Sequence, residues 1–273
     1  DNTRQAEAYV QKYNQIQLNG TLTYTDTFAE KHNLEAMLGT EYFTYDQFDF
    51  EAKTQNSPTD DIPTLNAGST RTYTSTTKTA YRILSGFGRI NYNYDMRYLI
   101  SFVARYDGIS KLKDNRWGFF PGVGWNIMEE RFWKDSKISG VISNLKPRLS
   151  YGVNGNVNGI GNFDVYGAYS QVGAKTYGGS TAFYNSGLVN TGLRWEQSQS
   201  FEAGLDIGFL NNRLSFILDY YNRTTKDLLT KQALPGYTGF TEIMTNMGTL
   251  RNYGFEMEVR ANILNNPKGL TWD

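Results

Sequence analysis

Residues 253–263 read Tyr253-Gly254-Phe255-Glu256-Met257-Glu258-Val259-Arg260-Ala261-Asn262-Ile263. Every odd position in this stretch carries an apolar side chain, and the positions between them carry glycine, asparagine or a charge. Because successive side chains of a β-strand point to opposite faces of a sheet, the stretch predicts a strand with one apolar and one polar face. The polar face meets water, and the apolar face meets either a protein core or lipid.

The same two-residue period recurs along the chain. Apolar side chains alternate with mostly polar ones over residues 96–106, 201–209 and 214–220, and more weakly over 16–25. The pattern predicts about nine complete long strands and the start of another. We place them at residues 15–28, 33–45, 81–94, 96–107, 116–128, 144–154, 194–209, 212–226 and 246–264, and then from 269.

Composition excludes several classes of protein. The chain has 273 residues, a formal net charge of zero, no cysteine and one histidine. A balanced charge gives no broad attraction to nucleic acid. The absence of cysteine excludes disulfides and thiolate metal sites, and a lone His32, which we interpret as a loop residue, argues against a His-based zinc site or a Ser-His-Asp triad. We therefore expect no metal, no cofactor and no nucleic-acid partner.

The predicted connections alternate between short and long ones. Short turns fall at 29–33, 93–95 and 210–212, and long loops fall at about 46–80, 155–193 and 227–245. A short hairpin is expected within the second of these loops, through 164–169 and 171–177. One exception to the alternation is the link 129–143, a long turn on the short side in which residues 128–133 are considered as a helical turn. This alternation is typical of outer-membrane barrels. Strands of about eleven residues, tilted by about 45°, rise roughly 25 Å and match the lipid-facing band, whereas strands of β-sandwiches mostly have about five or six residues.

Two all-β architectures are therefore considered. The favoured fold is part of an antiparallel, up-and-down transmembrane β-barrel, with about nine to ten strands of a larger barrel. The tyrosines Tyr92, Tyr94 and Tyr98 gather near one turn, as expected for an aromatic girdle at a membrane interface. The alternative is a soluble or surface-attached β-sandwich that binds glycans through tyrosine-rich loops.

In a barrel, the polar face of the sheet lines the interior. The residues predicted to face this lumen are Arg89, Asn91, Arg105, Asp107, Arg148, Asp206, Asp219, Glu256, Glu258 and Arg260. Charges of both signs either hold a plug through ion pairs or solvate a wide pore, and the sequence leaves both interpretations open.

Aromatic side chains in the predicted loops are the candidate substrate contacts. They are Tyr166, Tyr169, Tyr177, Tyr184 and Trp195. Aromatic rings with neighbouring amide side chains are a common way to bind a neutral polar ligand such as a sugar, while packing within the loops is the alternative for each ring. No pair of carboxylates is singled out as the acid and base that a glycosidase needs, so we expect no catalytic residue.

Several motifs, taken in chain order, carry a family resemblance. Residues 116–127, 142–156, 204–214, 219–222, 225–229 and 248–256 resemble the barrel of SusC/RagA-type TonB-dependent transporters. Residues 32–42, which begin with His32-Asn33-Leu34, are similar to an earlier strand of the same barrel.

The resemblance implies an outer-membrane importer of Bacteroidota-like bacteria, with a barrel of about 22 strands and an N-terminal plug that couples to TonB. A SusD-like surface lipoprotein covers the loops of such importers, whose cargo is usually oligosaccharide and sometimes peptide. Residues 1–273 are thus expected to be part of a single barrel domain that contacts lipid and conducts substrate without catalysis. A polar start without a signal peptide and a strand-like end at 270–273 predict an internal piece, with the plug and remaining strands outside it.

Overall fold

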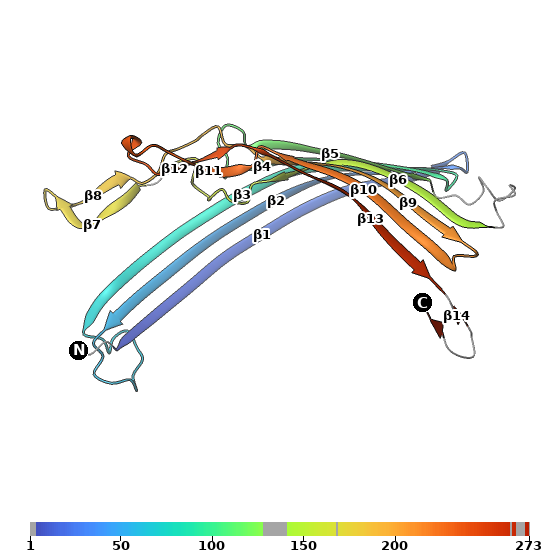
Figure 1. Ribbon diagram of the computed structural model, residues 1–273. Coiled ribbons are helices and arrows are strands. Elements are labelled where there is room, and N and C mark those ends of the chain that lie inside the picture. Colours follow the sequence, from blue (N-terminus) through green and yellow to red (C-terminus); the bar gives the residue numbers. More distant parts are fainter. Residues whose placement is uncertain (1–3, 128–140, 168, 263, 266–270, 273) are drawn as a thin grey trace.

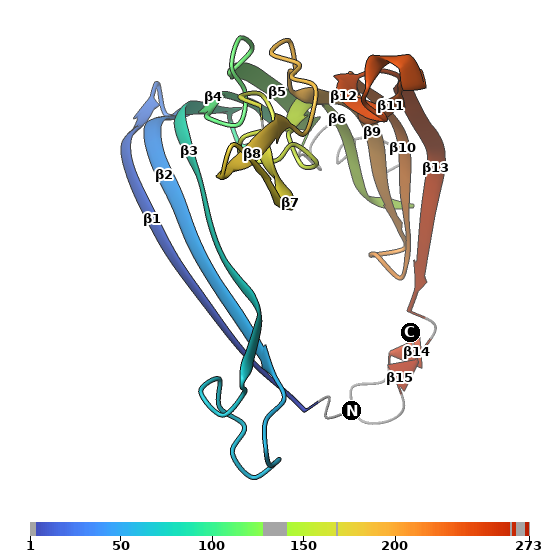
Figure 2. The ribbon, with the colours of Figure 1, turned by 90° about the vertical axis from the view of Figure 1, so that its left-hand side faces the viewer.

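The computed structural model describes residues 4–127, 141–167, 169–262, 264–265 and 271–272. Nine strands form one antiparallel, strongly curved sheet in the order β1-β2-β3-β4-β5-β6-β9-β10-β13 (Figures 1 and 2). Their bounds are Gln5–Phe28, His32–Gln55, Thr70–Tyr94, Tyr98–Ile109, Trp117–Ile127, Ile142–Asn156, Glu196–Phe209, Leu214–Lys226 and Thr249–Ala261. The sheet is a partial barrel that does not close, and β1 and β13 are its edge strands. The predicted all-β, up-and-down barrel fold is confirmed.

Smaller elements lie outside the main sheet. They are the hairpin β7 (Tyr169–Tyr177) and β8 (Ser180–Asn185), the hairpin β11 (Leu229–Ala233) and β12 (Glu242–Asn246), the short 3₁₀-helix η1 (Gly236–Thr238), and the pair β14 (Leu264–Asn265) and β15 (Thr271–Trp272). Among the described residues, no helix is long and apolar enough to span a membrane.

Cross-strand pairing gathers the apolar side chains of neighbouring strands on one face of the sheet. Met257 on β13 lies opposite Leu218 on β10, which lies opposite Leu205 on β9 and then Pro147 on β6. This face is not covered by a second layer within the described part of the chain, and Phe255 and Leu22 remain 84% and 75% exposed. The β-sandwich alternative needs a second sheet against this face, so the structure favours contact with lipid.

Short turns and long loops gather at opposite ends of the sheet (Figure 1). The turns at 29–31, 95–97 and 210–213 contain non-glycine residues with positive φ, such as Ala29 at 49° and Asp95 at 51°. Positive φ at consecutive turn residues suits the right-handed twist of paired strands. The loops 56–69, 157–195 and 227–248 lie at the other end, so the predicted alternation of connections is confirmed.

The structure differs from the predicted strands mainly in β1, β2 and β3, which have 24, 24 and 25 residues. Residues 5–14, 46–55 and 70–80 continue the pairing at the loop end, although the long loop was predicted to span 46–80. Residues 70–80 carry almost no apolar side chain on either face, while 5–14 and 46–55 keep a weaker alternation, with Ala6, Ala8 and Val10 and with Phe48, Phe50 and Ala52 on the apolar face. A hairpin predicted over 164–177 instead spans 169–185, because Gly178 and Gly179 adopt positive φ at its turn. The helical turn predicted at 128–133 lies outside the described residues.

His32 is not a loop residue as predicted, but the first residue of β2. Its ring stacks on Phe28 with centroids 5.1 Å apart, and its Nδ1 lies 2.6 Å from the hydroxyl oxygen of Tyr92. Tyr94 and Tyr98 continue the cluster across β3 and β4. Histidine therefore serves here as one ring of an aromatic cluster beside the short turns.

The main buried apolar cluster lies at the loop end of the sheet. It joins strand ends to the long loops, and its members are Ile109, Leu112, Phe120, Val157, Ile160, Val165, Leu193 and Trp195. Leu112 and Val165 are fully buried. Burying several large apolar side chains stabilises a packed arrangement by about 1.5–3 kcal/mol each, so this cluster fixes how the loops sit on the strands.

Candidate functional site

The polar face of the sheet carries all ten residues predicted to line a lumen. Alternation along each strand and the cross-strand register put them on this one face: Arg89, Asn91, Arg105, Asp107, Arg148, Asp206, Asp219, Glu256, Glu258 and Arg260. The ladder Arg148–Gly204–Asp219–Glu256, for example, crosses four neighbouring strands. The face is therefore a charged, hydrated wall opposite the apolar one.

Arg148 is the centre of one ion-pair group on this wall. Its Nη2 lies 2.8 Å from Oδ1 of Asp206 and 3.1 Å from Oδ1 of Asp219. Gly204 leaves the space for this arrangement, because a Cβ there would lie 2.9 Å from Cζ of Arg148 and would also meet Asp219 Oδ1. The two carboxylates and one guanidinium leave a net negative charge at this point of the wall.

Arg105 is the centre of a second group. Its Nε donates to Asp107 Oδ1 at 2.7 Å, and its Nη2 donates to the buried Ser85 hydroxyl at 2.9 Å. Nearby, Arg89 Nη2 pairs with Glu35 Oε1 at 2.7 Å. Arginine fixed by two or more oxygens loses little further freedom when a ligand passes, so these side chains form a firm polar surface.

Hollows open on the polar wall around Arg148. One, of about 270 Å³, is lined by residues that include Ser101, Asn126 and Glu202. Another, of about 510 Å³, is bordered by Arg148, Glu202 and Asp219 together with Arg223 and Glu256. The larger hollow has a mostly polar lining that offers hydrogen-bond donors and acceptors, while the smaller one also includes Leu99, Trp125 and Leu149.

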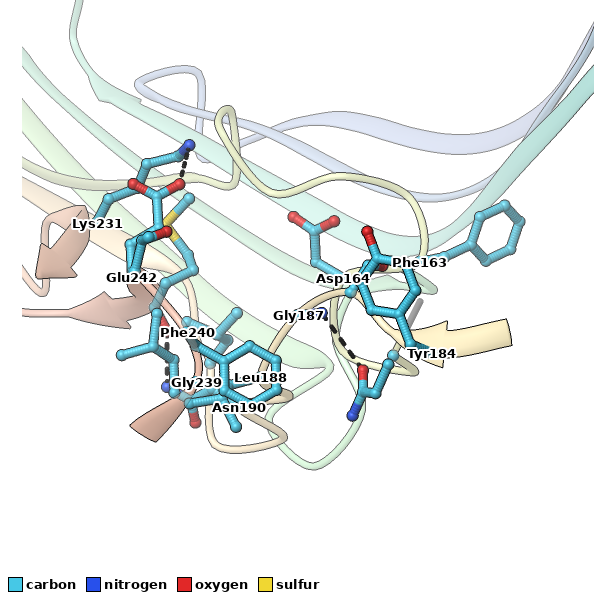
Figure 3. Close-up of a pocket in the computed structure, with 17 residues that line it drawn as sticks. Phe163, Asp164, Tyr184, Gly187, Leu188, Asn190, Lys231, Gly239, Phe240 and Glu242 are labelled. Carbon is cyan, nitrogen blue, oxygen red and sulfur yellow. Dashed lines mark hydrogen bonds and ion pairs between the residues drawn. The ribbon is translucent and has the colours of Figure 1, made fainter. Parts of the chain in front are cut away.

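A separate hollow of about 510 Å³ lies between two long loops at the loop end; we call it the loop hollow (Figure 3). Phe163, Asp164 and Tyr184 line one side, from the segment between β6 and β9. Phe240, Lys231 and Glu242 line the other side, from the segment between β10 and β13. Its further lining residues are Gly167, Asn185, Ser186, Gly187, Leu188, Asn190, Leu193, Gly239, Thr241, Ile243 and Met244.

The β11–β12 side of the loop hollow is tied down by polar contacts. Glu196, which is only 9% exposed, accepts hydrogen bonds from the backbone N–H of Leu229 and from the Asn156 amide, both at 2.6 Å. Asn246 donates to the Arg194 and Asp227 carbonyls at 2.9 and 2.8 Å. Two distant loops are thus locked together at the base of this hairpin.

Two of the charges around the loop hollow form an ion pair. Lys231 Nζ lies 2.6 Å from Glu242 Oε1, and this hydrogen bond raises the pKa of the lysine. Lys111 reaches the same region, with its Nζ 3.4 Å from the Ile160 carbonyl oxygen, and burial lowers its pKa although Asp164 acts in the opposite direction. Among the described residues, no three His, Cys, Asp or Glu side chains are grouped closely enough to hold a metal ion.

Comparison with known proteins supports the same architecture. The family model "TonB dependent receptor-like, beta-barrel" matches residues 1–273. The chain belongs to this family. TonB-dependent receptors of this type are transporters rather than enzymes, and they lie in the outer membrane.

Two curated TonB-dependent receptors are similar in sequence. TonB-dependent receptor SusC of Bacteroides thetaiotaomicron is 40% identical over 202 residues, which cover 70% of this chain and 19% of that protein. TonB-dependent receptor P3 of Formosa agariphila is 32% identical over 260 residues, which cover 92% of this chain and 25% of that protein. The chain thus spans about a fifth to a quarter of these relatives' length.

Solved structures of a transporter and a receptor show the same fold. The RagAB peptide transporter matches with a TM-score of 0.84 and 29% identity, covering 95% of this chain and 29% of that one. The siderophore receptor PirA from Acinetobacter baumannii matches with a TM-score of 0.53 at 13% identity over 91% of this chain and 34% of that one, which shows the fold alone. The resemblance to SusC/RagA-type barrels is confirmed.

The five predicted loop aromatics occupy different surroundings. Tyr184 lines the loop hollow. Tyr166 is half exposed, and its hydroxyl donates to the Ser110 carbonyl at 3.3 Å. Tyr169 and Tyr177 are 76% and 87% exposed, at the two ends of β7. Trp195 is buried against Phe120, so little of its ring is accessible to a ligand.

Sequence reasoning missed most of the residues that line the loop hollow. These residues come from two loop segments that β9 and β10 separate in the chain, and only the fold brings them together. They include Phe163 from the first segment and Lys231, Phe240 and Glu242 from the second. One signal was available, since Lys231 and Glu242 flank the turn-rich stretch 234–241, with its Pro235 and two glycines. Such a stretch between two short polar–apolar runs predicts a hairpin, which would have paired these two charges.

Proposed function

We propose that this TonB-dependent receptor chain is part of the wall of a nutrient importer, and that its loop hollow contacts an incoming oligosaccharide or peptide. The observation that carries the proposal is the loop hollow itself, which combines exposed rings with paired charges at the loop end of the barrel strands. Its volume of about 510 Å³ lies within the usual range for ligand sites, about 300–1,000 Å³.

The lining suits a polar polymer with apolar faces. Tyr184, Phe163 and Phe240 supply ring faces for a sugar ring or an apolar peptide side chain. Lys231 and Glu242 supply a donor and an acceptor, which stay mutually paired until a ligand group replaces one of them. Because Lys231 and Glu242 already satisfy each other, this side of the hollow favours neutral hydrogen-bonding groups, while Asp164 on the other side holds a carboxylate that accepts from the Gly161 N–H.

The polar wall then serves as a wet route toward the cell interior. Its ten predicted lumen residues are arranged in groups of opposite sign, such as Arg148 with Asp206 and Asp219. Each pairing offsets part of the charge, which limits electrostatic trapping of a passing substrate. The same groups supply ion-pair partners for a plug, and the two roles are compatible because a plug must leave before substrate passes.

The remaining partners belong to the whole protein. We propose that a SusD-like surface lipoprotein covers the loop end and that TonB acts through a plug outside residues 1–273. The similarity to the RagAB peptide transporter, which covers 95% of this chain, supports this arrangement. The apolar face, with side chains such as Phe255 exposed, contacts outer-membrane lipid.

The test compares matched ring removals in the full-length transporter. Tyr184→Ala and Phe240→Ala remove rings that line the loop hollow, whereas Tyr177→Ala and Tyr237→Ala remove rings that are 87% and 90% exposed outside it. Binding is measured by calorimetry with an oligosaccharide panel and a tryptic peptide digest. Loss of a ligand-contacting ring costs about 1–2 kcal/mol, or roughly 5–30-fold in affinity. Equal effects in the lining and control variants would refute the proposal.

A further inference from the structure

The apolar face of the sheet carries basic side chains toward the loop end. On β1 the main apolar part of this face runs from Phe28 to Ile16, both exposed, and the smaller side chains of Val10, Ala8 and Ala6 continue it beyond Lys12. Twelve steps of about 3.4 Å, tilted by about 45°, rise roughly 29 Å, which is close to the thickness of the lipid-facing band. Lys12 lies on the same face, four residues farther toward the loop end, and so falls at the level of lipid headgroups.

Lys12 belongs to a row of three side chains that crosses three strands. It lies opposite Phe48 on β2, and Phe48 lies opposite Lys78 on β3. Lys78 Nζ is 5.9 Å from the centre of the Phe48 ring. Since neighbouring strands are about 4.8 Å apart, the two lysine backbones lie roughly 10 Å from each other, a separation that two long flexible side chains can close around one anion.

Neither lysine is neutralised within the described part of the chain. The Lys12 ammonium has no ion pair or hydrogen bond there, and Lys78 contacts only the aromatic ring. The nearest carboxylate on this face, Asp46, is already paired with Arg82 at 2.9 Å. Both lysines are exposed, so the row presents two available positive charges beside a half-buried ring.

The other flank of the sheet repeats the feature. Lys226, at the end of β10, and Arg251, near the start of β13, occupy the apolar-face positions just beyond Tyr253. Within the described strands of the nine-stranded sheet, Asp46 is the one acidic side chain on this face at the loop end. Both flanks of the sheet therefore carry basic side chains on this face toward the loop end.

We propose that the Lys12–Phe48–Lys78 row binds a phosphate-bearing headgroup of a lipid in the outer leaflet of the membrane. This inference rests on the membrane placement of the apolar face. A phosphate group supplies the negative charge that would pair with the two ammonium groups. The acyl chains of the lipid then lie along Ile16 and Leu18, on the membrane side of the row. The Phe48 ring lies at the boundary between headgroups and acyl chains, a position that aromatic side chains favour.

The experiment uses the full-length transporter in nanodiscs of phosphatidylcholine with a small fraction of diphosphorylated lipid A. Lipid A retained by the protein is counted by native mass spectrometry. The test variant is Lys12→Gln/Lys78→Gln, and the control is Lys31→Gln/Lys113→Gln, which removes the same charge from exposed lysines in a short turn and in a loop. Lys12→Arg/Lys78→Arg restores both charges.

Each lysine near an anionic surface contributes about fivefold in affinity, so the test variant should bind lipid A roughly 30-fold more weakly. The control and the arginine variant should bind like the original protein, and lipid A stripped of phosphate should be retained poorly. Inorganic phosphate at millimolar concentration should not displace the lipid. Unchanged retention in the test variant, or equal retention of the stripped lipid, would overturn the proposal. Failure of the original protein to enter nanodiscs would instead contradict its membrane placement.

Discussion

Substitution of Met257 by arginine tests which face of the sheet meets lipid. Met257 lies at the centre of the apolar stretch 253–261 of β13, opposite Leu218, and is 69% exposed. Four residues separate it from each end of the stretch, or roughly 10 Å of rise on a tilted strand. That depth is near the bilayer midplane, where arginine on a lipid-facing position costs about 2–4 kcal/mol.

The matched control is Glu258→Arg, one residue along the same strand but on the polar face. It breaks only the exposed pair with Arg260, so it should cost less than about 1 kcal/mol. The free energy of unfolding is measured by urea titration of the full-length protein refolded into vesicles, with the folded fraction followed by its faster migration on unboiled gels. If the two substitutions are equally costly, or if Met257→Arg is the milder one, the assignment of the apolar face to lipid is wrong.

Two further substitutions test the site. Glu196→Ala removes a buried acceptor of two hydrogen bonds, one from the Leu229 N–H, and should loosen the β11–β12 hairpin by about 3 kcal/mol; hydrogen exchange at 229–246 should rise at least tenfold, and unchanged exchange would contradict the anchoring role. Gly204→Ala inserts a methyl group against Arg148 and Asp219 and should destabilise the protein by about 1–3 kcal/mol, seen as a lower urea midpoint; an unaltered midpoint would show that the ion-pair group shifts freely.

Most strands were predictable from the sequence because their two faces contact different surroundings. Where lipid faces one side and water the other, each strand must alternate, as residues 253–261 do, and the period survives in the sequence. β4 was predicted at 96–107 and spans Tyr98–Ile109, and β10 was predicted at 212–226 and spans Leu214–Lys226. Register then follows from the same pattern, since a slip of one residue would turn the charged face toward lipid.

The parts that were not predicted are those with water on both sides or with contacts far apart in sequence. Residues 70–80 pair as a strand without an apolar period, and in 5–14 and 46–55 the period rests on a few side chains such as Val10 and Phe50 among many polar ones. Trp195 looked like a loop aromatic, but its indole N–H donates to the Arg116 carbonyl at 3.1 Å and its ring packs in the buried cluster. A local pattern does not reveal a partner 79 residues away in the chain.

The placement of the buried core explains how one chain can serve both membrane and ligand. A barrel strand has no protein core behind its apolar face, so lipid supplies that contact, while the buried cluster around Leu112, Val165 and Leu193 lies at the loop end. The loops are therefore held by their own core and by Glu196, independently of lipid. Damage to the lipid face should reduce insertion without reshaping the loop hollow, and loss of a lining ring such as Tyr184 should weaken binding without affecting insertion.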